Sequence, residues 1–342
     1  RNQVEQVVLL PWLTMQWLAS LTLLLPIHPA VAWPRALNVT RYFHATSQGQ
    51  LHYVIGGDIL SAVPLVLFHS DPRSGSEFKY LMSTMSTLRP FLAVDYYGMG
   101  FSEECQCEES EFVRFTDYAA SVNDILLKHQ IQKFVPVGGL KGTNPALALA
   151  NLAGPGRVDH VVQIAPLMLP PSAIDYMLNK FIPSIMNPPI KSDGSHLLDV
   201  WKDASAAPFG PDGKPDSGTV DLLANEEKTI DFLICRNNGA RAKNQQAWVD
   251  FNGKIPEAVK SVSRHAQFLF IYATYVDADH AKYGMHPEWS KAQLTAALEG
   301  GLPYGNVTVE NATEGLLEQN STYVASLIEN FLFLQHFQVE IV

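Results

Sequence analysis

The amino-acid sequence predicts an α/β fold: a doubly wound, mostly parallel sheet of eight strands, with a helical lid inserted after the sixth strand. Apolar segments typical of strands alternate with segments whose apolar residues recur at helical spacing, which indicates a parallel sheet covered on both faces. This alternation breaks from Pro166 to about His265, where proline and glycine become dense, and it then resumes. We expect the interruption to be the lid.

The expected strands are short apolar runs. Val63–His69 is a solid run, Val-Pro-Leu-Val-Leu-Phe-His, of the kind found in a sheet buried on both faces. A Ser-Gln-Gly turn joins the first two strands into a hairpin, which adds an antiparallel edge to the sheet. The eight predicted strands are, in order, Asn38–Thr46, Gln50–Gly56, Val63–His69, Pro90–Tyr97, Lys133–Gly138, Val158–Ala165, Gln267–Val276 and Asn306–Glu310.

The expected helices are identified by their apolar faces. In Phe115–His129, for example, Tyr118 and Val122 share one face. The predicted helices outside the lid are Phe78–Leu88, Phe115–His129, Asn144–Leu152, Pro287–Leu298 and Thr322–His336.

The composition excludes several classes of protein. Of 342 residues, 47% are hydrophobic, which is enough to bury a large core and excludes a disordered chain. The 24 basic and 34 acidic residues give a net charge of -10, which argues against a nucleic-acid or anionic-lipid partner. Three cysteines are too few for a disulfide scaffold.

The N-terminus resembles a secretion signal. The apolar run from Trp17 to Leu25 suits the central region of a signal peptide, and Ala30-Val31-Ala32 fits the cleavage rule. We expect residues 1–32 to be the signal, with Met15 a candidate true start and residues 1–14 upstream of it, or else with the sequence truncated. Contact with a membrane is expected only if the segment stays uncleaved as an anchor, and a structural apolar helix is a third reading. The predicted localisation is secreted.

Two further segments complete the expected organisation of the chain. Residues 33–166 and 266–342 form the predicted core, and residues 167–265 form the lid.

Four N-x-S/T sequons accord with export, and three of them crowd a short stretch near the C-terminus. The candidate glycosylation sites are Asn38, Asn306, Asn311 and Asn320.

Four segments, taken in this order, resemble the α/β-hydrolase fold superfamily, in its lid-bearing esterase and epoxide-hydrolase branch. His69-Ser70 follows the third strand, where that family has His-Gly and builds part of its oxyanion hole. The stretch from Asp95 to Ser102 matches the family turn D-x-x-G-x-G-x-S. Gly138-Gly-Leu-Lys-Gly142 stands at the position of the G-x-S-x-G nucleophile elbow, and the next strand follows where expected. The resemblance covers about residues 40–335 without the lid.

The elbow departs from the family pattern at its centre. That position needs Ser, Cys or Asp, because the tight turn pushes the side chain into the pocket, and here it is Leu140. The flanking Gly138 and Gly142 remain, so we expect the turn itself to form. Shifting Lys141 to the centre would lose the glycine spacing. His69, Ser70 and Lys141 are expected to line the pocket and oxyanion region.

The other members of a catalytic triad are unevenly present. The family acid follows the seventh strand, where the sequence offers Asp277 or Asp279. Counting back from the Leu-Glu-Gln stretch at 317–319 places Thr313 where the family has histidine. No histidine lies between His286 and His336, so the usual general base is missing.

Two other groups invite a chemical interpretation. Asp277, Asp279, His280 and His286 could resemble a metal site, but their spacing fits no strong signature, so we expect a solvated loop and neither metal nor cofactor. The pair Cys105 and Cys107 is not expected to close on itself; either thiol is a candidate to bridge Cys235, with unpaired thiols as the alternative. Ser102 is expected to cap its turn rather than act in catalysis.

These observations predict a secreted α/β-hydrolase-like protein that does not use Ser-His-Asp hydrolysis and binds a small apolar ligand or a protein partner. The alternative is an active hydrolase or lyase that uses unorthodox residues on an ester-type substrate. A third possibility is a purely structural or adhesive glycoprotein.

The signal sequence gives the first testable prediction. We expect the mature, secreted chain to begin at Trp33, directly after Ala30-Val31-Ala32. N-terminal sequencing or mass spectrometry of the secreted form measures this directly. Recovery of a membrane-bound product with residues 1–32 intact would contradict it.

Overall fold

The computed structural model describes residues 39–85, 89–108, 111–186, 191–196, 230–234, 239–274, 281–310, 312 and 315–337. All of these belong to one unit of the chain, residues 36–342. Within it, eight strands form a single sheet in the order β1-β2-β4-β3-β5-β6-β7-β8. The strands are β1 (Val39–Thr46), β2 (Gly49–Gly56), β3 (Leu65–Phe68), β4 (Phe91–Val94), β5 (Val135–Gly139), β6 (His160–Ile164), β7 (Gln267–Ala273) and β8 (Gly305–Val309).

The predicted mostly parallel sheet of eight strands is confirmed. The hairpin β1–β2 and the pair β2–β4 are antiparallel, and every other neighbouring pair is parallel. Leu65 of β3 lies opposite Phe91 of β4 on one side and Val135 of β5 on the other. This register brings the carboxyl ends of β3, β4 and β5 to the same edge of the sheet.

Alternate residues of the central strands enter two different cores. In β3, Val66 and Phe68 face one core, whereas Leu65 and Leu67 face the other. Because side chains of a strand point alternately to opposite faces, a strand buried on both faces must be apolar throughout. The unbroken apolar run predicted as the third strand therefore has its physical reason here.

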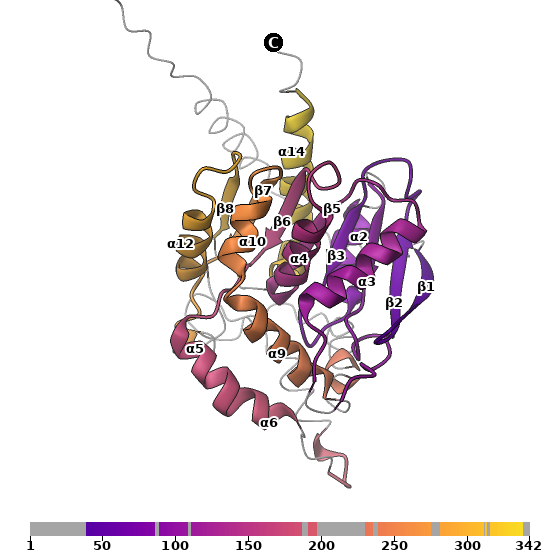
Figure 1. Ribbon diagram of the computed structural model, residues 1–342, viewed down its shortest axis with the longest axis vertical. Coiled ribbons are helices and arrows are strands. Elements are labelled where there is room, and N and C mark those ends of the chain that lie inside the picture. Colours follow the sequence, from indigo (N-terminus) through magenta and orange to yellow (C-terminus); the bar gives the residue numbers. More distant parts are fainter. Residues whose placement is uncertain are drawn as a thin grey trace, which may run out of the picture. The chain divides into compact units, whose positions relative to one another are not determined.

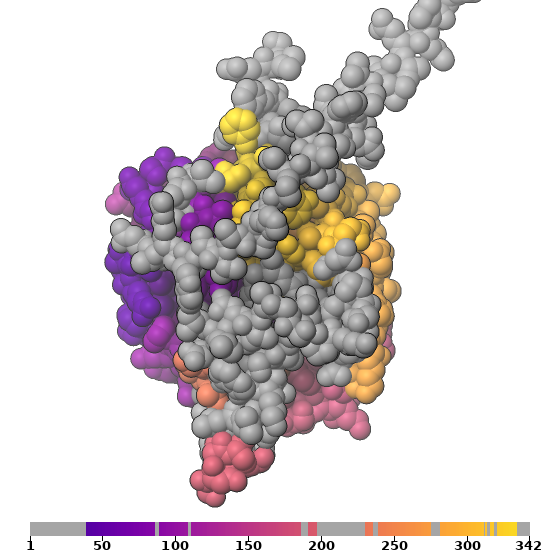
Figure 2. Space-filling view, turned by 180° about the vertical axis from the view of Figure 1, so that it is seen from behind, coloured from indigo at the N-terminus to yellow at the C-terminus, as the bar shows by residue number. Residues whose placement is uncertain are grey.

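Helices cover both faces of the sheet (Figure 1). On one face α3 (Phe115–Lys128), α4 (Thr143–Ala153), α10 (Ile255–Val262) and α12 (Pro287–Ala297) pack in sequence, α3 on α4, α4 on α10 and α10 on α12. On the other face α2 (Lys79–Met85), preceded by the turn η1 (Gly75–Phe78), contacts α13 (Leu316–Gln319) and α14 (Ser321–Phe337). In Figure 2, seen from behind, α14 is visible in yellow on this second face.

Between β6 and β7 the chain forms helices and no strand among its described residues. These are α5 (Pro171–Tyr176), the π-helical segment η3 (Met177–Phe181), α6 (Ile182–Met186), α9 (Ala240–Asn252) and α10. Helix α9 contacts α6 and η3 as well as α3 and α4 of the main body. A large part of the predicted lid, including residues 197–229, lies outside the described residues, so its limits at 167 and 265 stay a prediction.

Most element boundaries differ from the prediction by only a few residues. The helix predicted over Phe78–Leu88 begins at Lys79, and a 3₁₀ turn precedes it, which the Ser74 side chain caps by accepting a hydrogen bond from the Ser76 backbone. No helix within the described part of the chain is long and apolar enough to span a membrane. The predicted signal segment, residues 1–32, falls outside that part.

Candidate functional site

The elbow after β5 has the geometry of a strand–turn–helix. Strand β5 ends at Gly139, the short turn η2 (Leu140–Gly142) follows, and α4 begins at Thr143. Leu140 has a φ of 47°, in the left-handed region that L-residues other than glycine rarely adopt. Holding leucine there costs about 1–3 kcal/mol, a cost that the surrounding packing must offset.

Two glycines make this turn possible. A Cβ on Gly138 would lie 2.4 Å from the Gly142 carbonyl oxygen, and a Cβ on Gly142 would lie 2.0 Å from the carbonyl oxygen of Phe68. The turn therefore closes on itself and presses against the end of β3, with Leu140 midway between the glycines. As the glycine spacing predicted, Leu140 and not Lys141 stands at the centre of the turn.

The Leu140 side chain has packing contacts and no chemistry. It is half-buried and touches the apolar cores on both faces of the sheet. Its branched hydrocarbon carries no lone pair that could attack a carbonyl carbon. The elbow is thus formed as a backbone structure without a nucleophile at its centre.

A buried ion pair joins the elbow to the loop after β3. Lys141 Nζ lies 2.8 Å from Asp71 Oδ1, and the two side chains are 8% and 0% exposed. Burial alone would raise the pKa of Asp71, but the charges of Lys141 and Arg241 and the hydrogen bonds that it accepts hold the pKa below its ordinary value of 3.8. The carboxyl is therefore ionised at neutral pH.

Helix α9 covers this ion pair. Gln245 donates from Nε2 to Asp71 Oδ2 at 2.5 Å, and the Arg241 guanidinium Nε lies 3.8 Å from the same oxygen. The ring of Trp248, itself buried, lies with its centroid 5.1 Å from Lys141 Nζ, a cation–π distance. Three side chains of one helix thus close over the region where the resemblance places an oxyanion hole.

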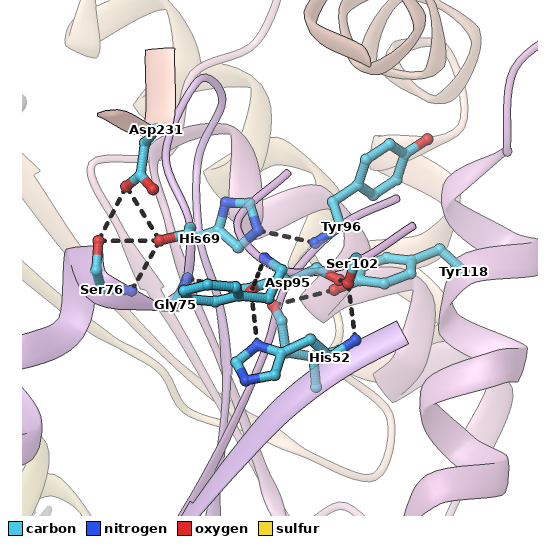
Figure 3. Close-up of polar contacts among 12 residues, drawn as sticks. His52, His69, Gly75, Ser76, Asp95, Tyr96, Ser102, Tyr118 and Asp231 are labelled. Atoms are coloured by element: carbon cyan, nitrogen blue, oxygen red, sulfur yellow. Dashed lines mark hydrogen bonds and ion pairs between the residues drawn. The ribbon is translucent and has the colours of Figure 1, made fainter. Parts of the chain in front are cut away.

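His69 and Ser70, both predicted to line this region, are engaged with the backbone. Figure 3 shows His69 Nε2 accepting from the Tyr96 backbone N–H, at 2.9 Å, and its Nδ1 donates to the Ser70 carbonyl oxygen at 2.8 Å. This pairing fixes a neutral imidazole with its proton on Nδ1, so neither nitrogen is available as a general base. The Ser70 backbone N–H donates to the carboxylate of Glu77 at 2.6 Å.

A second buried carboxyl lies beside this loop, and sequence reasoning missed it. Asp231 accepts hydrogen bonds from Ser74 Oγ and Ser76 Oγ, at 3.0 and 2.9 Å, and its Oδ2 lies 3.8 Å from Arg73 Nε. Figure 3 shows the contact between Asp231 and Ser76. Burial raises the pKa of Asp231, and the Arg73 charge and the serine bonds oppose that rise. No local pattern could have revealed a contact across 155 residues.

The Asp95–Ser102 turn is held together by Asp95. Its carboxylate accepts from Gly75 N, Phe101 N and His52 Nδ1, at 2.7, 3.0 and 2.8 Å. Figure 3 shows Asp95 with Gly75 and His52 beside it. Burial pushes the pKa of Asp95 up, but the hydrogen bond from His52, chief among the opposing contacts, brings it below its ordinary value. Gly100 is the second glycine of this turn, and a Cβ there would lie 2.2 Å from Asp95 Oδ2. The motif therefore serves structure.

The expected capping role of Ser102 agrees with its contacts. Ser102 Oγ accepts from the His52 backbone N–H at 2.8 Å and donates to the Asp95 carbonyl oxygen at 2.9 Å. His52, by contrast, was not singled out from the sequence, since a lone histidine in a strand carries no signal.

The predicted pairing of the cysteines is wrong. Cys105 and Cys107 form a disulfide with each other, and their Cα atoms lie 5.2 Å apart, within the range that a disulfide spans. The expectation that a C-x-C pair does not close on itself therefore does not hold for this loop. Cys235, the expected partner, lies outside the described residues.

Several predicted site residues also lie outside the described part of the chain: Asp277, Asp279, Thr313, Asn38 and Asn311. Of the remaining sequons, Asn306 is exposed on β8 and Asn320 is half-buried before α14. The described residues contain no group of three or more acidic, histidine or cysteine side chains that could hold a metal ion.

Comparison with solved structures identifies the fold. A bromoperoxidase from Bacillus anthracis superposes with a TM-score of 0.65 at 14% identity, over 87% of this chain and all of that one. A carboxylesterase from Bacillus subtilis gives 0.55 at 15%, over 87% and 92%, and the epoxide hydrolase CorEH gives 0.61 at 15%, over 87% and 99%. The sequence matches no model of a known protein family and no curated protein. The chain therefore has the α/β-hydrolase fold, as its motifs indicated.

The close approach at the elbow gives a stability prediction. Gly142→Ala should destabilise the fold by about 3 kcal/mol, the upper end for overpacking, because its Cβ would meet backbone carbonyls that cannot rotate away. Gly253→Ala is the matched control, since Gly253 has a φ of -67° and nothing within 4 Å of its added Cβ. Urea unfolding of both variants measures the difference; equal stabilities would contradict the close approach.

The buried ion pair gives a pH-dependent prediction. Lys141→Met should cost about 3–5 kcal/mol of unfolding free energy near neutral pH, because it leaves a buried carboxylate without its main partner. The lowered pKa of Asp71 means that the pair stabilises the fold above 3.8 and that this contribution is lost as pH falls below that value. The difference between parent and variant should therefore shrink in acid.

The control for this experiment is an exposed pair. Lys133 and Asp159 form an ion pair with side chains 54% and 49% exposed, and Lys133→Met should cost at most about 1 kcal/mol. Urea titrations at neutral pH and below 3.8 compare the variants. If Lys141→Met and Lys133→Met lower the free energy of unfolding by the same amount, the buried Lys141–Asp71 pair does not stabilise the fold more than an exposed pair does, and the prediction is wrong.

Proposed function

We propose that this chain is a secreted, non-hydrolytic protein of the α/β-hydrolase fold that acts by binding rather than by turning over an ester. The observation that carries the proposal is the elbow, which is built in full around Leu140. Covalent catalysis needs a nucleophile at that position and a base within hydrogen-bond reach of it. Leucine supplies no nucleophile, and His69, the histidine on the adjoining loop, has both nitrogens committed to the backbone.

Export is part of this proposal. The apolar N-terminal segment with its Ala30-Val31-Ala32 site and the four sequons support it. The Cys105–Cys107 disulfide adds support, because disulfides persist mainly in oxidising compartments such as the secretory pathway.

Of the two partner classes expected from the sequence, a protein partner fits the packing better than a small apolar ligand. The space between the elbow and the β3 loop contains the Lys141–Asp71 ion pair, and Trp248 packs over it. An apolar ligand in that space would have to separate two buried charges, which is strongly unfavourable. A partner that binds elsewhere on the surface meets no such cost.

A fluorescent fatty-acid analogue tests the choice between these partners. We expect no rise in melting temperature, whereas a ligand present at 100 times its Kd would add about 2.7 kcal/mol to the stability. A melting temperature that rises to a plateau with added analogue, by an amount that the Lys141→Met change alters, would overturn the choice of a protein partner. It would favour an apolar ligand at the elbow.

Restoring the missing chemistry tests the proposal that the protein does not hydrolyse esters. The parent and Leu140→Ser should show no turnover of a p-nitrophenyl ester, because a serine without a base stays protonated. The double change Leu140→Ser with Thr313→His should show turnover, with the new base contributing about 10²–10⁴ in rate. Thr313→His alone is the control.

Two results would contradict this reading. Turnover by the parent at the level of the double variant, or stoichiometric labelling of the parent by a serine-reactive phosphonate, would mean an active enzyme with unorthodox residues. Full activity of Leu140→Ser alone would mean that a base lies elsewhere than position 313.

A further inference from the structure

The Cys105–Cys107 disulfide lies on the surface loop that follows the Asp95–Ser102 turn. Both cysteines are half-buried, and their Cα atoms are 5.2 Å apart. Cys105 rests against the apolar core, and beside it lies a small cavity of about 10 Å³ that Lys243 of α9 also lines. This disulfide is separate from the elbow and plays no part in the function proposed above.

A structural role explains this disulfide poorly. A bridge stabilises a fold mainly by closing a loop in the unfolded chain, and its effect is smallest for the shortest loops. The loop is also held without it: Glu103 N donates to Gln50 O at 2.8 Å, and Gln106 N donates to Gln48 O at 2.9 Å. These two hydrogen bonds hold the backbone just before Cys105 and between the two cysteines without help from the disulfide.

The surroundings of Cys107 favour its thiolate as a leaving group. Lys243 Nζ lies 3.8 Å from Cys107 Sγ, and a neighbouring ammonium stabilises a thiolate. Cys107 Sγ also lies 3.6 Å from the Glu111 carbonyl oxygen. A disulfide sulfur has no proton to donate, so this contact becomes a hydrogen bond only when Cys107 is a thiol. Lys243 thus stabilises the departing thiolate, and the Glu111 carbonyl oxygen accepts a hydrogen bond once Cys107 has become a protonated thiol.

We propose that Cys105–Cys107 is a redox-active disulfide that oxidises dithiols of other polypeptides. A substrate thiolate attacks Cys105 Sγ, the Cys105–Cys107 bond breaks, and Cys107 leaves as a thiolate beside Lys243. The second substrate thiolate then attacks the substrate sulfur of the mixed disulfide and releases Cys105. The substrate loses two electrons and two protons and gains a disulfide, and the protein pair takes up the two electrons and two protons as thiols.

Charge around the disulfide selects the substrate. Glu103, Glu104 and Glu108 are exposed on the same loop, so a cationic segment is attracted and an anionic one is repelled at low ionic strength. The substrate class is therefore a pair of cysteine thiols flanked by lysine or arginine, rather than an anionic thiol such as glutathione.

The experiment uses the full, oxidised chain and two synthetic reduced peptides, each with two cysteines, one flanked by lysines and the other by glutamates. We expect the lysine peptide to become oxidised with one peptide disulfide formed per protein disulfide lost. Alkylation followed by peptide mapping should locate the new thiols at Cys105 and Cys107. The glutamate peptide should react about 10-fold more slowly, and added salt should narrow the gap.

Three variants distinguish disulfide exchange at Cys105–Cys107 from an unrelated oxidation of the peptide. The double change Cys105→Ser with Cys107→Ser should abolish peptide oxidation while the melting temperature shows that the loop still folds. Lys243→Met should slow the reaction about 3-fold to 10-fold, since a thiol of higher pKa leaves more slowly, and Lys243→Arg should restore it.

The proposal is overturned if neither peptide is oxidised while the native protein keeps its disulfide, or if the new thiols map to Cys235. Equal rates for the lysine and glutamate peptides at low salt would overturn the assigned substrate class. Should the double serine variant fail to fold, peptide mapping of the parent still decides between these outcomes.

Discussion

Gly142 cannot carry a side chain, and the arrangement of the whole site depends on that constraint. A Cβ at this position would lie 2.0 Å from the Phe68 carbonyl oxygen and 2.7 Å from that of His69. The turn after β5 therefore presses directly on the end of β3. That contact sets Lys141 within 2.8 Å of Asp71, although seventy residues separate them in the chain. The side chain at position 140 takes no part in this contact, which joins the backbone of Gly142 to the end of β3. A different residue at the centre of the elbow therefore leaves the contact unchanged.

The ion pair that results changes what the region can do. A buried ion pair is stabilising only when further hydrogen bonds complete it, since the loss of water around both charges offsets their attraction. Asp71 meets that condition through the hydrogen bond from Gln245, and the charge of Arg241 lies 3.8 Å from the same oxygen; both residues are on α9. Helix α9 is thus attached to the floor of the site by polar contacts in addition to its apolar ones. A helix attached in this way covers the Lys141–Asp71 pair next to the elbow, which agrees with the proposal that a partner binds elsewhere on the surface.

The sequence was sufficient to predict the sheet, but it was not sufficient to predict the polar contacts between residues far apart in the chain. Strands such as β3 and β7 were predictable because both of their faces are buried, which forces an unbroken apolar run. The elbow was predictable because only glycine fits at Gly138 and Gly142. The pairs Asp71–Gln245 and Ser74–Asp231 were not, because their members lie 174 and 157 residues apart and follow no local spacing. The cysteine pairing was predicted wrongly because the Cα separation of 5.2 Å between Cys105 and Cys107 depends on a local backbone conformation that the sequence did not indicate.

A division runs through these residues between what the fold requires and what catalysis requires. Asp95 with its three donors, Gly100 packed against it, and Gly142 at the elbow are backbone-organising residues, and all are present. At the centre of the elbow, where the side chain serves only the chemistry, Leu140 stands in place of a nucleophile. A chain that had lost the fold as well would show substitutions in both groups. The scaffold residues are therefore present without a nucleophile at the elbow, and the proposed binding function needs the scaffold and its surfaces but not that nucleophile.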